Sequence, residues 1–270
     1  MSKSLAQAGP FARERVLYPL TARSVHVRQT SRPAPHFIRL TVAGADLEGM
    51  KAHGPGDHLR VFFPDPASGI LNAPSTGPDG LIPPPAPGLH RDFTPLHLRT
   101  GADGVPELDL DFFLHHHPGP AAQFATRAEP GDRLVLVGPR GSITAPPGAE
   151  RLVCFVDETA LPATARWLQL TPPSTAVEVY TRADRWVETY LADNGGRRAR
   201  VHPLVTDLVS AARAAHLGRS TYVFAAGEAS ELATLRRFIL KELGLAGEQC
   251  DFSGYWKRGV SEYDHHAPLD

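Results

Sequence analysis

The sequence predicts two domains: an N-terminal antiparallel Greek-key β-barrel and a C-terminal α/β domain built on a parallel sheet. From about residue 20 to 145, short segments that alternate polar and apolar residues are separated by turn residues, as half-buried antiparallel strands are. After residue 150, apolar runs alternate with segments of helical spacing, which indicates a parallel sheet with right-handed crossovers. The polar segment APPGAE separates the two patterns, so we expect domains at 18–145 and 150–262.

The N-terminal half contains several short strands and one helix, which favours a small closed or nearly closed barrel. The segment PGPAAQFATRA predicts the helix, because Pro120 near its start lacks only an N–H that has no partner within a helix. The Pro-rich segment 64–90 is expected to form a loop. The predicted strands are SVHVRQT, HFIRLTVAG, HLRVFFP, RDFTPLHLR, ELDLDFFLH and GDRLVLVGPRG.

The C-terminal half alternates strands and helices. RLVCFVD is a nearly continuous apolar run, as in a strand covered on both faces, and TAVEVYT, ARVHPL and STYVFAAG are the further predicted strands. The predicted helices are ALPATARWLQL, DRWVETYLADNGG, VTDLVSAARAA and EASELATLRRFILKELG, two of them with a glycine stop. The remaining segment, CDFSGYWKRGVSEYDHHAPLD, is expected to be a tail.

The composition excludes several classes of protein. The 270 residues carry a net charge of -1, so no basic surface for a nucleic acid is indicated. No apolar run reaches the roughly 18 residues of a membrane span, and the N-terminus lacks the apolar stretch of a secretory signal. Two cysteines, Cys154 and Cys250, cannot form a disulfide framework. We therefore expect a cytoplasmic protein, and a monomer because no coiled-coil pattern is present.

The stretch RDFT has the side chains that a flavin site uses. In an extended strand Arg91 and Phe93 project to one side and Thr94 to the other. A guanidinium can hold a diphosphate by paired hydrogen bonds, an aromatic ring can lie against a fused ring, and a threonine can hydrogen-bond a ring nitrogen. A strand with one surface arginine and one core phenylalanine is the simpler alternative for four residues alone.

The segment that follows favours an anion. LDLDFFLHHHPGPAAQFA runs from a strand through a Gly-Pro turn into a helix, whose N-terminus attracts negative charge. Gly119, Pro120 and Ala121 are small, so a phosphate can approach the backbone, and His115 can stack on or hydrogen-bond to a nucleotide. The three consecutive histidines do not predict a metal site, because at most His115 and His117 share a face of the strand.

The C-terminal domain has no G-x-G-x-x-G after its first strand. The sequence there is DETALPA, in which Asp157 and Glu158 would repel a phosphate, and Asp157 or Thr159 can instead cap a helix. Arg182 follows the second strand, where a cation favours NADPH over NADH, although a surface arginine explains it equally well.

Two later segments carry further candidates. In AAGEAS, Gly227 lets a ligand approach the backbone, and Glu228 either favours the helix dipole or caps the helix. GYWKRG concentrates two aromatic and two basic side chains, which core packing and solvation would also explain.

Taken in order, RDFT, DFFLH with GPAAQFA and PGDRLVLVGPRG, DETALPA, AAGEAS and GYWKRG resemble the signatures of the siderophore-interacting proteins, FAD-containing ferric-siderophore reductases related to the ferredoxin reductases. The resemblance covers about residues 18–262 and departs from the R-x-Y-T motif at Phe93, which loses a phenol O–H. It implies an FAD-binding barrel, an NAD(P)H-binding domain and reduction of ferric siderophores in the cytoplasm, with release of Fe(II).

The residues and the resemblance together give a set of candidate site residues. Those expected to bind FAD or NAD(P)H are Arg91, Asp92, Phe93, Thr94, His115, Gly119, Pro120, Ala121, Asp157, Glu158, Thr159, Arg182, Gly227, Glu228, Tyr255 and Trp256. Those expected to act in catalysis are Thr94, Lys257 and Arg258, with no protein ligand to a metal. Two alternatives stay open: a ferredoxin-linked or general flavin reductase, and a non-redox siderophore-binding protein on the same fold.

Overall fold

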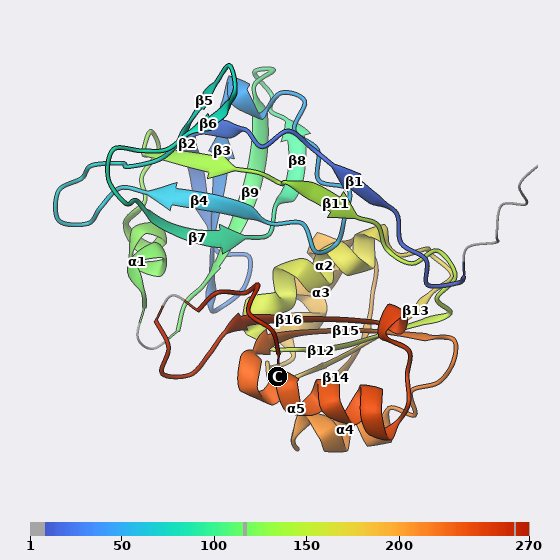
Figure 1. Cartoon of the computed structure of the whole chain (residues 1–270). Helices are drawn as coiled ribbons and strands as arrows, with labels where there is room; N and C mark the ends of the chain where they lie inside the picture. Colours follow the sequence, from blue (N-terminus) through green and yellow to red (C-terminus); the bar gives the residue numbers. More distant parts are fainter. Residues whose placement is uncertain (1–8, 116–117, 262, 270) are drawn as a thin grey trace, which may run out of the picture. The chain divides into compact units, whose positions relative to one another are not determined.

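The structure, a computed structural model, describes residues 9–115, 118–261 and 263–269 (Figure 1). The chain forms two compact units, which we call the barrel unit (Arg15–Ile143) and the sheet unit (Met1–Glu14 with Thr144–Asp270). All strand pairs in the barrel unit are antiparallel, and all those in the five-stranded sheet of the sheet unit are parallel, within the described residues. The predicted fold class is therefore confirmed.

The barrel unit is a curled seven-stranded sheet with strand order β7-β4-β10-β2-β3-β9-β8. Two short ribbons, β1 with β11 and β5 with β6, accompany it. The bounds are β1 (Arg15–Leu17), β2 (Ala22–Ser31), β3 (Phe37–Ala43), β4 (Leu59–Phe63), β5 (Ser75–Gly77), β6 (Gly80–Ile82), β7 (Leu89–Phe93), β8 (Leu96–Thr100), β9 (Pro106–Phe113), β10 (Arg133–Val137) and β11 (Gly141–Ile143), with a 3₁₀ turn at Ala45–Leu47 and helix α1 (Pro120–Arg127).

The predicted single strand RDFTPLHLR is in fact two strands, so that prediction was wrong. β7 ends at Phe93 and β8 begins at Leu96, and the two lie at opposite edges of the sheet, joined only by Thr94 and Pro95. Pro95 has no N–H to give to a ladder, which favours a break at this point. Because consecutive strands occupy the two edges, the sheet must curl until the covalent chain links them. The barrel is therefore nearly closed without a β7–β8 ladder.

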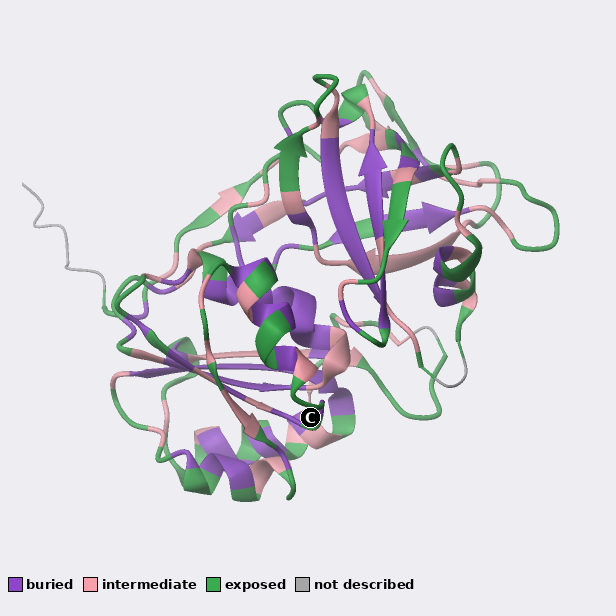
Figure 2. Ribbon diagram, turned by 180° about the vertical axis from the view of Figure 1, so that it is seen from behind, coloured by how far each residue is buried: buried purple, intermediate pink, exposed green. Residues whose placement is uncertain are grey.

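The inward faces of the strands form one apolar core, seen as the purple strands of this unit in Figure 2. Val25, Leu40, Val61, Leu110 and Leu134 are each at most 3% exposed. Helix α1 adds small side chains to this core. Burying about one large aliphatic side chain per strand contributes roughly 1.5–3 kcal/mol each, so this interior supplies much of the stability of the unit.

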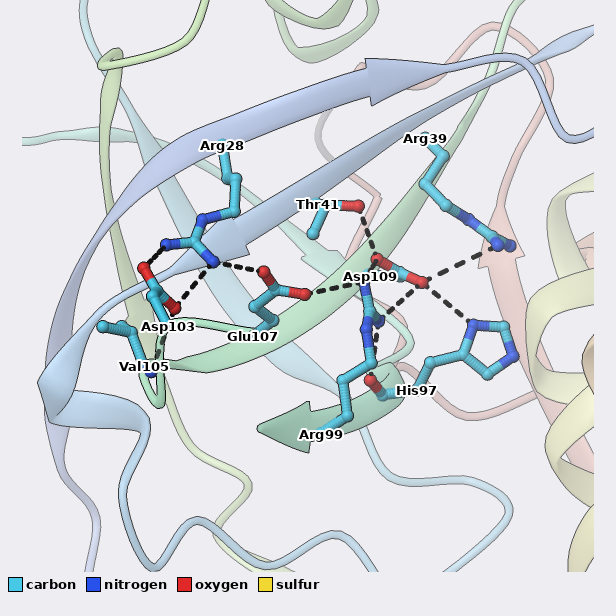
Figure 3. A network of polar contacts seen from close by, with 9 residues as sticks. All are labelled: Arg28, Arg39, Thr41, His97, Arg99, Asp103, Val105, Glu107 and Asp109. Atoms are coloured by element: carbon cyan, nitrogen blue, oxygen red, sulfur yellow. Dashed lines mark hydrogen bonds and ion pairs between the residues drawn. The ribbon is translucent and has the colours of Figure 1, made fainter. Parts of the chain in front are cut away.

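The outer face of β9 carries buried charge instead of apolar residues. Glu107, Asp109 and Asp111 alternate with the inward leucines of this strand, and each is less than 9% exposed. Basic and polar side chains from β2, β3 and β8 form hydrogen bonds and ion pairs with Glu107 and Asp109 in the network of Figure 3. Arg39 also makes two parallel hydrogen bonds to Asp111, of 2.7 Å each. Buried carboxylates need such partners, because an unpaired buried charge is strongly destabilising.

The sheet unit has strand order β14-β13-β12-β15-β16, with every neighbouring pair parallel. The C-terminal segment that we expected to be a tail contains β16, the fifth strand of this sheet, so that prediction was also wrong. β16 lies at the edge and is mostly half-exposed, so it lacks the apolar run that marks a central strand. The bounds are β12 (Arg151–Val156), β13 (Ala176–Thr181), β14 (Arg200–Pro203), β15 (Thr221–Glu228) and β16 (Cys250–Trp256).

Helices connect these strands as predicted. α2 packs against α3 and α4 against α5, and α5 continues into a π-helical segment at Phe238–Glu242. Gly196 ends α3 in the left-handed conformation, as the sequence indicated. No helix of the described residues is long and apolar enough to cross a membrane. The bounds are α2 (Leu161–Leu170), α3 (Trp186–Gly195), α4 (Leu208–Ala214) and α5 (Ala229–Arg237), with 3₁₀ turns at Glu158–Ala160 and Gly247–Gln249.

Residues 9–14 pack within the sheet unit, which the sequence did not reveal. Arg13 donates from Nε to the carbonyl of Thr144 (2.7 Å) and from Nη1 to Tyr222 Oη (2.7 Å) and Asp251 Oδ2 (2.8 Å). Its guanidinium also lies 5.1 Å from the centre of the Trp167 ring. Arg13 thus ties together three elements of the sheet unit.

Candidate functional site

Strand β7 presents Arg91 and Phe93 on one face, as predicted. These residues pair with Val61 and Leu59 of β4, whose side chains belong to the barrel core, so both point toward the interior side of the sheet. Both are half-buried. Arg91 donates from Nη1 to the carbonyl of His90 at 2.6 Å, which bends its guanidinium back along the strand.

The outward face of β7 carries Asp92. Its carboxylate accepts hydrogen bonds of 3.1 and 3.2 Å from Arg60 on β4, an ion pair across the two strands. Asp92 therefore points away from the face that holds Arg91. Thr94 lies just beyond β7 and is half-buried at the link to β8.

An aromatic cluster positions helix α1 against β7. The ring of Phe93 lies 4.2 Å from that of Phe112 and 6.0 Å from that of Phe63. Phe124 of α1 lies 5.4 Å from the same Phe63 ring. Phe93 and Phe124 thus share one neighbour, and β7 and α1 lie side by side because both bury aromatic surface there. The sequence analysis missed this cluster. Its signal was the pair of phenylalanines in each of the predicted strand segments VFF and DLDFF.

The N-terminus of α1 is open. Gly119 is the N-cap residue, with no side-chain hydrogen bond to the helix, and Pro120 occupies the first turn. The next two residues are Ala121 and Ala122, so no side chain longer than a methyl group competes for the N–H groups. Gln123 donates to the carbonyl of Pro118 at 3.0 Å, which fixes the incoming backbone. The geometry suits an anion at the positive end of the helix dipole.

His115 precedes this turn and is exposed. Its ring meets that of Phe113 edge-on, at 5.6 Å and 66°. The other two histidines of the run, at 116 and 117, lie outside the described residues, so the prediction that His117 holds no metal with His115 stays a prediction.

In the sheet unit, Asp157 lies just beyond the carboxyl end of β12. It caps the following 3₁₀ turn by accepting from Thr159 N (2.9 Å) and Oγ1 (2.5 Å), and its other oxygen accepts from Trp256 Nε1 at 2.8 Å. Burial raises the pKa of Asp157, and the hydrogen bonds from Thr159 and Trp256 oppose that shift. The capping role that the sequence left open for Asp157 is confirmed.

Gly227 and Glu228 lie at the end of the neighbouring strand β15. Gly227 has φ 143°, and a Cβ there would lie 2.4 Å from Asp157 Oδ2, so only glycine fits beside this carboxylate. Glu228 caps α5 by accepting from Glu231 N (2.8 Å), and it also accepts from Arg258 N (3.1 Å). Burial opposes ionisation of Glu228, but the N–H donors outweigh burial and lower its pKa.

The chain turns sharply after β16. Val260 N donates to the carbonyl of Lys257 at 3.0 Å, and Gly259 supplies the positive φ of 77° that the turn requires. The side chains of Lys257 and Arg258 are exposed and make no ion pair within the described residues. Tyr255 is half-buried, and burial raises the pKa of its phenol.

The structure thus brings the predicted residues together in two clusters, one in each unit. The remaining candidates lie apart from both. Arg182 follows β13 and forms an exposed ion pair of 2.8 Å with Glu231 of α5. Glu158 is half-buried in the first turn after β12.

Two family models match the chain: a siderophore-interacting FAD-binding domain over residues 26–143 and a siderophore-interacting protein domain over residues 149–259. The ferric vibriobactin reductase ViuB of Vibrio cholerae is 28% identical over 265 residues, which cover 94% of each chain. The NADPH-dependent ferric-chelate reductase of Escherichia coli is 35% identical over 159 residues, 58% of this chain and 59% of the relative.

A crystal structure of a siderophore utilization protein from T. fusca is 35% identical and matches with a TM-score of 0.80, covering 95% of this chain and all of that one. The domain matches follow the barrel unit and the sheet unit in order, and the full-length likeness exceeds what a shared fold alone requires. The chain belongs to the siderophore-interacting protein family.

Proposed function

We propose that this protein is an FAD-dependent reductase of ferric siderophores that takes its electrons from NAD(P)H. The observation that carries the proposal is the open N-terminus of α1 packed beside β7, in a unit that matches a siderophore-interacting FAD-binding domain. Named relatives that reduce ferric vibriobactin and ferric chelates support the same chemistry.

The barrel unit fits FAD. Gly119 and Ala121 leave the first N–H groups of α1 accessible to a diphosphate, and Arg91 on the adjacent strand can add a guanidinium. Thr94 at the end of β7 can hydrogen-bond a ring nitrogen. Phe112 packs against the ring of Phe93, so a flavin could contact only the part of this half-buried ring that Phe112 leaves uncovered. Bound FAD supplies a carrier that accepts two electrons together and gives them up singly.

Such a carrier suits this pair of substrates. Nicotinamide donates two electrons as hydride, whereas iron(III) accepts one. Siderophores hold iron(III) through hard oxygen donors, which bind iron(II) far less tightly, so reduction alone loosens the metal. The protein then needs no iron ligand of its own.

The exposed cations of the turn after β16 suit the substrate. Many ferric siderophores are anionic, and we propose that Lys257 and Arg258 attract and orient them. The backbone N–H of Arg258 is already bonded to Glu228, which fixes the turn while leaving both side chains free to move. The two unpaired cysteines, Cys154 and Cys250, suit a cytoplasmic setting.

The electron donor is proposed to bind the sheet unit at the carboxyl ends of its strands, where parallel sheets bind nucleotides. Arg182 follows β13 at this edge, and its exposed ion pair with Glu231 is weak enough to exchange for a 2′-phosphate. This position favours NADPH.

The test is an absorption spectrum followed by two half-reactions. We expect purified protein to be yellow, to lose its flavin absorption when NADPH is added under argon, and to regain it when a ferric siderophore follows. Titration with NADH and with reduced ferredoxin in place of NADPH identifies the donor. A colourless protein that takes up no FAD on titration would rule out the proposal.

A further inference from the structure

We propose that Asp157 is a positioning residue that fixes the indole of Trp256 as a platform for the nicotinamide ring of the electron donor. This inference rests on the proposed function in one respect, the use of a nicotinamide nucleotide as electron donor. Asp157 would orient the indole of Trp256, and would not itself bind the phosphates of the nucleotide.

The hydrogen bond between the two residues crosses a whole strand. Asp157 follows β12, Trp256 ends β16, and β15 lies between these strands in the sheet. Strands two places apart are separated by roughly 10 Å, so the two side chains must reach toward each other over β15. They meet beside Gly227, whose missing side chain leaves the space that the carboxylate occupies.

The hydrogen-bond pattern shows that Asp157 acts as an acceptor on both oxygens. Oδ1 accepts from the N–H and the hydroxyl of Thr159, and Oδ2 accepts from the indole N–H. An ionised carboxylate offers acceptor sites to all three of these donors. A charged acceptor gives a stronger hydrogen bond than a neutral one, so the indole is held in one orientation.

Trp256 is unusual among the large aromatic side chains of the sheet unit because it is exposed. It has 36% of its surface accessible, whereas Trp167, Tyr222 and Phe224 have at most 1%. Fixing this half-exposed indole in one orientation costs side-chain entropy, and the ring gains less from burial in return than a core side chain does. A fixed flat ring at the ligand-binding edge of a parallel sheet is suited to stacking on another flat ring.

The charges at this edge favour the nicotinamide over the diphosphate. Asp157, Glu158 and Glu228 bring three carboxyl groups to the ends of β12 and β15, and these repel phosphate. Nicotinamide becomes a pyridinium cation as it gives its hydride to the flavin. An indole face next to a carboxylate attracts such a cation, and does so increasingly as the positive charge develops.

The experiment records the three indole N–H peaks of the ¹⁵N-labelled holoprotein by NMR, with Trp256→Phe identifying the peak of Trp256. We expect NADP⁺ to shift this peak by ring current, and 2′,5′-ADP, which lacks the nicotinamide, to bind without shifting it. NAD⁺ and ADP serve as the second pair. The platform is wrong if NADP⁺ and NAD⁺ bind and leave the peak in place, or if neither binds.

Asp157→Ala tests the positioning. The Trp256 peak should move upfield and exchange rapidly with water, and the affinity for NADP⁺ should fall about 5-fold while that for 2′,5′-ADP is unchanged. Asp207→Ala is the matched control: Asp207 also caps a helix, accepting from Ser210 N at 2.9 Å and Oγ at 2.8 Å, but within the described residues it accepts no hydrogen bond from an indole. An unchanged peak in Asp157→Ala, or the same change in both variants, would overturn the role.

Two further comparisons separate the outcomes. If Asp157→Ala does not fold, Trp256→Phe keeps a ring without the N–H donor and should lower the affinity for NADP⁺ but not for 2′,5′-ADP. Reduction of a ferric siderophore is assayed independently. A chain that shows the NADP⁺ shift and reduces no siderophore loses the proposed function but keeps the platform, and an active reductase with no shift loses only the platform.

Discussion

Replacing Asp109 by asparagine tests how far the charged outer face of β9 stabilises the barrel unit. Asp109 accepts hydrogen bonds from Thr41 Oγ1 (2.7 Å), His97 Nδ1 (3.0 Å) and Arg99 Nη2 (3.2 Å), as Figure 3 shows. Burial works against ionisation, but the bonds from His97, Thr41 and Arg99 outweigh it and lower the pKa of Asp109 from 3.8 to about 2. The folded protein therefore stabilises the ionised form of this carboxylate relative to the unfolded chain.

The shift gives both a magnitude and a pH window. A difference of about 2 units between the folded and unfolded pKa corresponds to roughly 2–3 kcal/mol of stability. Because the folded pKa is the lower one, this contribution is complete above about pH 4 and is lost as the pH falls toward 2. At pH 7, Asp109→Asn should lower the urea midpoint of the barrel unit by roughly 1 M.

The assay is urea unfolding followed by circular dichroism at several pH values from 7 to 2.5. We expect the difference between the chain and the Asp109→Asn variant to be constant from pH 7 to 5 and to shrink below pH 4. Asp103→Asn is the control, because Asp103 belongs to the same network but its side chain is 50% exposed, so its loss should matter much less. A difference that does not change with pH, or an equal effect of both variants, would refute the reasoning.

Three further outcomes follow from single contacts. Arg13→Ala should lower the free energy of unfolding of the sheet unit by about 3 kcal/mol, because it leaves the half-buried carboxylate of Asp251 without its partner. Arg15→Ala is the control, because Arg15 is exposed and its loss should leave the free energy of unfolding unchanged; thermal unfolding measures both. Gly227→Ala should displace the Asp157 carboxylate, and the loss of a distinct Trp256 indole N–H peak would reveal it. Lys257→Ala should slow turnover of anionic ferric siderophores more than flavin reduction by NAD(P)H in stopped-flow half-reactions; an equal loss in both would count against a substrate role.

Two sequence patterns, polar–apolar alternation in the N-terminal half and strand–helix alternation in the C-terminal half, were enough to predict the fold class of both units. The alternation in ELDLDFFLH indicates a strand covered on one face, and the apolar run RLVCFVD indicates a strand covered on both faces. These local patterns distinguish an antiparallel sheet from a parallel one without knowledge of the strand order. The break in RDFTPLHLR was missed because Thr94 and Pro95 interrupt the alternation for only two residues. Whether a proline ends a strand or lies on a tolerant edge depends on the strand order, which a local pattern does not contain.

The sequence predicted the candidate site as a set of segments, without the contacts between their residues. Asp157, Gly227 and Trp256 were each expected near a nucleotide, but their mutual contact depends on β15 lying between β12 and β16. The expected tail hid β16, so the neighbour of β15 was unknown. A contact across a strand becomes predictable only when the sheet order is known.

The acidic turn after β12 distinguishes this sheet from one that carries the G-x-G-x-x-G motif after its first strand. In that motif the first helix offers free N–H groups to a diphosphate. Here Asp157 already accepts from the N–H of Thr159, so the turn has a carboxylate where the diphosphate would lie. We therefore expect a nucleotide at this edge to gain its affinity elsewhere, from a cation such as Arg182 and from the flat ring of Trp256. We propose that this aspartate both repels the phosphate and orients the indole, so that one side chain would determine which part of a nucleotide this edge repels and which part it binds.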